Sequence, residues 1–134
     1  TIDSFQHWVY SNPEHTRDER EAAWIEIRRR FGSEMNWDGI DGFRGVSWQV
    51  QGHLYGAPFY YIEYGIAQLG SLQLWQTHRK DRGEALDDYA KAMSLGTTKT
   101  LPELFSAANL RLGFSEEHLE PLIGEIGVAM KELA

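Results

Sequence analysis

The sequence contains no cysteine and carries few cations, and it has no long apolar run. The missing cysteine excludes a disulfide framework and a thiolate site, and it favours the cytoplasm. The 13 basic residues are outnumbered by 20 acidic ones, for a net charge of -7. Such a chain repels a phosphate backbone, so we expect no nucleic-acid partner. No apolar run approaches the roughly 20 residues of a membrane span, and no signal peptide is present, so we expect no membrane partner.

What the sequence does contain is the composition of a globular domain. Apolar residues make up 42% and charged residues 25% of the 134 positions. A chain of this length buries roughly two-thirds of its unfolded surface, so we expect a single helical unit over residues 1–134. The sequence begins with Thr1 rather than Met and enters an amphipathic pattern directly. We therefore expect a fragment of a longer protein.

Apolar residues recur at helical spacing through most of the chain. Ile2, Phe5, Trp8 and Val9 predict a first helix over residues 2–11. Thr16 and Glu19 form a capping box that opens a second helix, which Gly32 ends. Further helices are expected over residues 58–80, 81–96 and 100–109, and after Ser115. No segment alternates as a strand does, so the predicted fold class is all-α, an irregular helical domain.

Two of these helices carry more detailed expectations. Pro58 suits the first turn of the helix over 58–80, and its wide apolar pattern predicts burial on most sides. Gly70 within that helix predicts the close approach of another helix or a ligand. In the last helix, the expected inner stripe consists of Leu119, Ile123, Ile126 and Met130.

The segment from 33 to 57 is rich in glycine, and short helical turns around 40–51 are expected in it. It leads into "HLYGAPFYYIEYG", residues 53–65. On a helix, Tyr64 would lie about 40° around the axis from Tyr60 and about 60° from Tyr61. Phenols are neutral donors with a pKa near 10, and can hold an oxygen that gains negative charge. His53 would add a second donor.

A structural interpretation competes with this one. Tyrosines at helical spacing are commonly amphipathic packing residues whose hydroxyls reach the surface. The five histidines show no i, i+4 pair, and the sequence has no His-Glu-x-x-His. No three candidate ligands have zinc-site spacing, so we expect this chain by itself to bind no metal.

Three stretches, "IDSFQHWVY", "PFYYIEYGIAQLGSLQLW" and "LGTTKTLPELF", together resemble the C-terminal part of oligoendopeptidase F. This enzyme belongs to the thimet-oligopeptidase-like family of zinc metallopeptidases. The resemblance covers nearly the whole chain and implies the C-terminal segment of a zincin-type catalytic domain. It also implies that short peptides are the substrates. The zinc of the full-length protein would be held upstream, by a His-Glu-x-x-His helix and a further Glu, both absent here.

The resemblance also implies roles for residues of this chain. His53, Tyr61 and Tyr64 match the His and Tyr set that binds the substrate backbone and stabilises the oxyanion. The spacing is one residue shorter than in the thimet branch, so Tyr60 competes with Tyr61 as the partner of Tyr64. Tyr55 is a further substrate-binding candidate. Gly52 and Gly56 would be flexible points that let the segment swing towards a bound peptide.

The fragment alone would not hydrolyse peptides, because its zinc ligands lie in the upstream part of the same catalytic domain. If that part packs on this one, an exposed apolar patch and self-association of the fragment are expected. The alternative is a stand-alone helical module that binds peptides without cutting them, or that serves in oligomerisation. A Tyr-lined cleft suits peptide binding, because tyrosine gives large contact area at low entropic cost.

Overall fold

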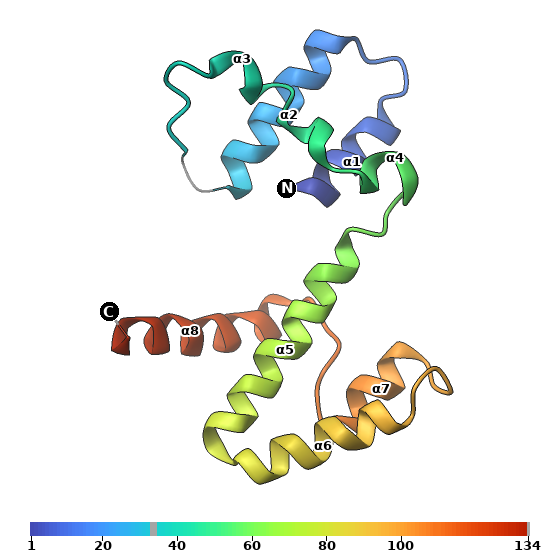
Figure 1. The fold of residues 1–134 in the computed structure, drawn as a ribbon, viewed down its shortest axis with the longest axis vertical. Coiled ribbons are helices and arrows are strands. Elements are labelled where there is room, and N and C mark those ends of the chain that lie inside the picture. The colour runs from blue at the N-terminus through green and yellow to red at the C-terminus, as the bar shows by residue number, and fades with distance from the viewer. Residues whose placement is uncertain (33–34, 134) are drawn as a thin grey trace. The chain divides into compact units, whose positions relative to one another are not determined.

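The computed structural model describes residues 1–32 and 35–133, and over this range it is helical without any strand (Figure 1). The predicted all-α class is therefore confirmed. The elements are α1 (Ile2–Ser11), α2 (Arg17–Phe31), α3 (Asp41–Arg44), the 3-10 helix η1 (Ser47–Val50), α4 (His53–Gly56), α5 (Ile62–Lys80), α6 (Arg82–Ser94), α7 (Leu101–Ala107) and α8 (Glu116–Glu132). Of the helices described, none has both the length and the apolar character that a bilayer span requires.

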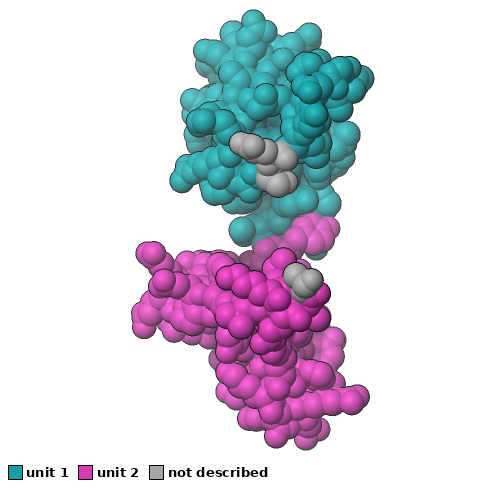
Figure 2. Space-filling model, turned by 90° about the vertical axis from the view of Figure 1, so that its left-hand side faces the viewer, with its two compact units in different colours: residues 1–63 teal, residues 64–134 magenta. Residues whose placement is uncertain are grey.

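The chain divides into two compact units, residues 1–63 and residues 64–134, which Figure 2 colours separately. The boundary falls in the first turn of α5. The first unit contains α1–α4 with η1, and the second contains most of α5 together with α6–α8. A single unit over 1–134, as the length suggests, stays a prediction, and each compact unit is described by itself.

Three aromatic side chains form the core of the first unit. Phe5 of α1 is fully buried, and its ring lies 5.0 Å from that of Trp24 on α2 and 5.5 Å from that of Trp48 on η1. Edge and tilted contacts of this kind are the favoured arrangements of aromatic pairs. The partly buried residues around them are Ile2, Trp8, Val9, Ile27 and Leu54. One buried cluster thus joins α1, α2, η1 and α4.

The capping box predicted for α2 is present. The backbone N–H and Oγ1 of Thr16 each donate to Glu19 Oε2 at 2.8 Å, and the Glu19 N–H donates back to Thr16 Oγ1 at 3.3 Å. The hydrogen bond from the Thr16 backbone lowers the pKa of Glu19, because it favours the charged carboxylate. At the other end, a Cβ on Gly32 would come within 2.7 Å of the Arg28 carbonyl oxygen. A side chain is therefore excluded at Gly32, which caps the end of the helix at an ordinary φ of −99°.

The short turns expected around 40–51 are also present, as α3 and η1. Ser47 fixes η1 to α2, because its Oγ accepts from Trp24 Nε1 at 2.8 Å and from Arg28 Nη1 at 3.1 Å. The Arg28 guanidinium also lies over the rings of Trp24 and Trp37. These contacts hold Trp48, the next residue along η1, against the core.

The prediction that a helix begins at Pro58 is wrong, because α5 begins at Ile62. Phe59 has a φ of +59°, in the left-handed region that interrupts a right-handed helix. Its ring lies 5.0 Å from that of His7 and 5.2 Å from that of Tyr10, both on α1. Phe59 therefore packs against α1 at the position where the helix is interrupted. The spacing of apolar residues near Pro58 could not predict this contact, because α1 is distant in the sequence.

The expected burial of α5 on most sides is also wrong. Among its described residues only Gly70 and Gln73 are buried, and the N-terminal turns are largely exposed. The close approach expected at Gly70 is confirmed, since a Cβ there would lie 3.1 Å from Phe105 Cζ on α7. Gln73 ties α5 to the segment before α8. Its Nε2 donates to the Arg111 carbonyl oxygen, and its Oε1 accepts from the Arg111 N–H, both at 2.9 Å.

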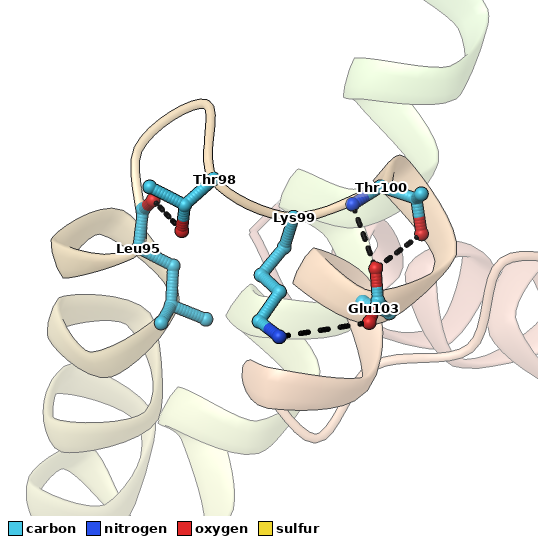
Figure 3. Close-up of polar contacts among 5 residues, drawn as sticks. All are labelled: Leu95, Thr98, Lys99, Thr100 and Glu103. Carbon is cyan, nitrogen blue, oxygen red and sulfur yellow. Dashed lines mark hydrogen bonds and ion pairs between the residues drawn. The ribbon is translucent and has the colours of Figure 1, made fainter.

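The connection from α6 to α7 is built from local hydrogen bonds (Figure 3). Gly96 has a φ of +54° and ends the turn after α6. Thr98 Oγ1 donates to the Leu95 carbonyl oxygen at 2.7 Å. The N–H and Oγ1 of Thr100 donate to Glu103 Oε2 at 2.8 and 2.7 Å, while Lys99 Nζ lies 3.8 Å from Glu103 Oε1. The "LGTTKTLPELF" stretch is thus a helix stop followed by a helix start.

The inner stripe predicted for α8 is only half correct. Leu119 and Ile126 are partly buried, but Ile123 is 60% exposed and Met130 is 66% exposed. Leu122 and Ala129 are buried in their place. The apolar residues of α8 lie on two sides of the helix. The side that carries Leu122 and Ala129 is the buried one. Ile123, Val128, Met130 and Leu133 leave an apolar surface exposed on this helix and its C-cap.

Candidate functional site

The site predicted from "HLYGAPFYYIEYG" begins on α4, a four-residue helix within the first unit. Gly52 precedes it, and the Gly56 N–H donates to the Gly52 carbonyl oxygen at 3.1 Å. The Ala57 N–H then donates to the His53 carbonyl oxygen, also at 3.1 Å. These two bonds close the turn that presents the His53 side chain.

The imidazole of His53 lies against two of the predicted tyrosines. The rings of His53 and Tyr60 are stacked at 5.9 Å with 3° between their planes. The ring of Tyr61 meets His53 edge-on, at 5.4 Å and 82°. His53 and Tyr61 are half-buried, and Tyr60 is 52% exposed. The structure thus brings His53, Tyr60 and Tyr61 together. Tyr64 lies on α5, in the part that belongs to the second unit.

The route by which these phenols converge differs from the predicted one. Tyr60 and Tyr61 precede α5, so a shared helix face does not align either of them with Tyr64. The left-handed Phe59 instead turns the chain back after α4. The Tyr60 N–H donates to the Ala57 carbonyl oxygen at 3.1 Å, which closes that turn. The His53–Tyr60–Tyr61 group is therefore built by a turn.

The other predicted residues are neighbours of His53 in the sequence, and they are Tyr55, Gly52 and Gly56. The ring of Tyr55 stacks on the ring of Trp48, with 6.1 Å between their centroids, so Tyr55 packs against the first unit. A Cβ at Gly52 or Gly56 would meet no atom within 4 Å. Gly52 also has an ordinary helical φ of −53°. The observed conformation therefore does not require glycine at Gly52.

A cavity of about 290 Å³ lies in the first unit, beside α4. Leu54 and Tyr55 line it from α4, and Phe5, Gln6 and Val9 line it from α1. The sequence prediction missed Gln6, which is 1% exposed. The signal was available, because Gln6 lies one helical turn from Ile2 and from Val9, on the apolar side of α1.

In chemical terms, the residues around His53 supply neutral hydrogen-bond donors. An imidazole N–H and phenol O–H groups can each donate to the carbonyl oxygen of a peptide. Within the described part of the chain, no three His, Asp or Glu side chains are grouped as a metal site would require.

Comparison with known proteins decides the family. The model of peptidase family M3 matches residues 1–122. The chain belongs to peptidase family M3. The matched range includes the whole His53–Tyr64 segment, so the resemblance drawn from the sequence is confirmed. No curated relative matches this M3 chain.

Two solved structures are similar to this M3 chain over almost all of its residues. One is described as an oligoendopeptidase F, with 36% identity and a TM-score of 0.89 over 97% of this chain. The other is a Pz peptidase A with an inhibitor, with 37% identity and a TM-score of 0.90 over 98% of this chain. The M3 chain spans about a quarter of their length, 23% and 24%.

Proposed function

We propose that this chain is the C-terminal, substrate-binding part of a zinc-dependent oligopeptidase that cleaves internal bonds of short peptides. The observation that carries the proposal is the M3 family match over residues 1–122, which contains every residue of the candidate site. Similarity to an oligoendopeptidase F and to a Pz peptidase A, each at more than a third identity, supports it.

In this proposal His53, Tyr61 and Tyr64 are the catalytic donors. His53 donates to the backbone of the bound peptide, while the phenols donate to the carbonyl oxygen that becomes an oxyanion. Tyr60 contacts His53 as Tyr61 does, so it remains the competing partner of Tyr64. Neutral donors suit this task, because they need no proton transfer and are aimed before the charge develops.

Zinc and its ligands belong, in this proposal, to a part of the polypeptide outside these residues. The described His, Asp and Glu side chains are scattered and do not form a zinc site. From the family resemblance we expect the ligands upstream, in the same catalytic domain. The chain alone is therefore expected to bind peptides without hydrolysing them.

The surface of α8 supports a missing neighbour. Ile123 and Met130, seven residues apart on one side of the helix, each expose more than half of their surface. Apolar side chains gathered on one helix commonly mark an interaction surface. We assign this face to the upstream part of the domain. In the isolated chain it would favour self-association.

Tyrosine-to-phenylalanine substitutions in the longer protein test the proposal. Tyr64→Phe is expected to lower kcat on a short peptide by ~10²–10³, because one donor to the oxyanion is lost. Tyr60→Phe and Tyr61→Phe, made separately, identify the second donor by the larger loss. Tyr89→Phe on α6 is the matched control and should leave kcat unchanged. Zinc content, measured by metal analysis, should stay full in all four variants.

Two results would contradict the proposal. If kcat is unchanged in Tyr60→Phe, Tyr61→Phe and Tyr64→Phe, the three tyrosines serve in packing and not in catalysis. A longer protein that binds peptides but never cleaves them, with no bound metal, would favour the stand-alone peptide-binding module.

A further inference from the structure

Phe59 adopts a backbone conformation that its residue type disfavours. Its φ is +59°, in the left-handed region. Among the described residues, the others with a positive φ are Gly39, Gly96 and Asn109. Glycine and asparagine enter this region readily, whereas a bulky side chain there is an outlier. Such a conformation persists only where surrounding contacts impose it, so the Phe59 side chain must supply those contacts.

The ring of Phe59 is held by α1. Its centroid lies 5.0 Å from that of the His7 ring, with 54° between the planes. It lies 5.2 Å from the centroid of the Tyr10 ring, with 45° between the planes. His7 and Tyr10 are three positions apart, so they lie on the same side of α1. Because tilted contacts at these distances are favourable for aromatic rings, two side chains of α1 fix the Phe59 ring in place.

These ring contacts lie outside the core of the first unit. Phe59 is 46% exposed and Tyr10 is 47% exposed. The buried cluster consists of Phe5, Trp24 and Trp48, and Phe59 does not belong to it. A ring that keeps nearly half of its surface in water gains little from the burial of apolar area. The role of Phe59 is therefore more local than core packing.

The residues that directly follow Phe59 are the candidate donors Tyr60 and Tyr61. The Tyr60 N–H donates to the Ala57 carbonyl oxygen at 3.1 Å, which closes the turn around Phe59. Beyond this turn, the ring of Tyr60 stacks on that of His53 at 5.9 Å, and the ring of Tyr61 meets it edge-on at 5.4 Å. A change of φ at Phe59 rotates the chain that carries both phenols relative to α4, which carries His53. The conformation of Phe59 therefore sets where the two phenols lie.

We propose that Phe59 is a positioning residue for the candidate site. Its ring, fixed against His7 and Tyr10, holds the left-handed turn, and the turn holds Tyr60 and Tyr61 beside His53. Donors stabilise an oxyanion best when they are aimed before the charge develops. Without the ring, every donor would remain present but would be badly aimed. The inference rests on the proposed function, because it concerns the orientation of the same donors.

Phe59→Gly separates the role of the ring from that of the backbone. Glycine enters the left-handed region freely, so the turn can still form, but no ring fixes it to α1. In the longer protein, kcat on a short peptide is expected to fall by ~10–10², less than for a lost donor. KM should change by less than about twofold, because the aim of the donors matters in the transition state. Phe59→Tyr keeps the ring and should restore kcat.

A second pair of variants tests whether Phe59 acts through its contact with α1. Tyr10→Leu removes one of the two rings that hold Phe59, so kcat should fall in the same way. Combined with Phe59→Leu, it should cause no further loss, because both residues act through one contact. Phe43→Leu is the matched control. Phe43 lies on α3, is 66% exposed, and its substitution should leave kcat unchanged.

NMR of the 134-residue chain tests the geometry independently of catalysis. Nuclear Overhauser effects between the ring protons of His53 and Tyr61 are expected in the wild type and in Phe59→Tyr. They should be weaker in Phe59→Gly, because the turn is no longer fixed to α1. If Phe59→Gly fails to fold, Tyr10→Leu provides the same comparison, since it leaves Phe59 in place and removes only a ring that holds it.

Three results would overturn the inference. Full kcat in Phe59→Gly would show that the backbone turn alone is sufficient. Losses of kcat that add in the double variant would show that Phe59 and Tyr10 act separately. Equal Overhauser effects in the wild type and the variants would show that the ring does not position the phenols. The proposed function fails separately, if the longer protein cleaves no peptide while the Overhauser effects depend on Phe59 as expected.

Discussion

The contact between Gly70 and Phe105 gives a prediction whose magnitude follows from the structure. Gly70 is buried in the interior of α5, and a Cβ there would lie 3.1 Å from Phe105 Cζ and 3.3 Å from Cε1. Both distances are shorter than ordinary van der Waals contact, so Gly70→Ala forces the Phe105 ring to move. The ring belongs to α7, which has only seven residues and is also fixed by its capping contacts at Thr100.

Two effects of opposite sign act on Gly70→Ala. Alanine is better than glycine in a helix interior by about 1 kcal/mol. Crowding of a packed contact costs about 1–3 kcal/mol. We expect the second effect to win, and the free energy of unfolding to fall by about 1 kcal/mol. The same substitution at Gly124 in α8 meets no atom within 4 Å, so there only the helix-propensity gain of about 1 kcal/mol applies.

Urea unfolding of the 134-residue chain, followed by circular dichroism, measures both variants. The two substitutions are chemically identical, so the predicted difference of about 2 kcal/mol isolates the contact with Phe105. Adding Phe105→Leu to Gly70→Ala should recover part of the loss, because the smaller side chain leaves room for the Cβ. Equal stabilisation by Gly70→Ala and Gly124→Ala would refute the reasoning, since α7 would then not approach α5 as described.

Two further predictions concern the cap of α2 and the turn at α4. The lowered pKa of Glu19 means that its contribution to stability is present above the unfolded pKa of about 4.5 and is lost as the pH falls through the folded value. In urea unfolding, Glu19→Gln should therefore destabilise the chain at neutral pH, and the destabilisation should shrink progressively as the pH falls below about 4.5. Gly52→Ala should stabilise the chain by about 0.4–1 kcal/mol, because its φ is ordinary and its Cβ meets nothing. If Gly52 is a hinge of the longer protein, the same variant lowers kcat, while Gly42→Ala in α3 leaves kcat unchanged.

Helix ends were the feature best predicted from the sequence. Residues 2–11 were expected to be helical and form α1, and the capping box of Thr16 and Glu19 is present. Thr100 and Ser115 occupy the N-cap positions expected of them. Such signals are reliable because a cap and the backbone groups it satisfies lie within four residues of each other.

The errors all arose where a distant contact decides the outcome. Pro58 was expected to begin a helix, but Phe59 adopts a left-handed conformation with its ring against His7 and Tyr10. Ile123 was placed on the inner face of α8, which carries two apolar faces in its sequence. Local periodicity reports an apolar side chain and not the element that covers it.

The residues of the candidate site stay a prediction, and the geometry expected for them was wrong. His53 and the tyrosines were selected for their chemistry and for a family resemblance, and the M3 match confirms the family. Their convergence was attributed to one helix face, whereas a turn brings Tyr60 and Tyr61 to His53.

By itself the sequence determined the helical class, the positions of most helix ends and the chemical character of the segment from His53 to Tyr64. These follow from interactions between residues a few positions apart, which a chain carries wherever it folds. Only the tertiary structure decided which faces are covered, that Phe105 presses on Gly70, and that the Gln6 amide is buried with no hydrogen-bond partner among the described residues. Those outcomes depend on segments distant in the sequence, because burial and pairing are properties of the packed chain and not of any one stretch.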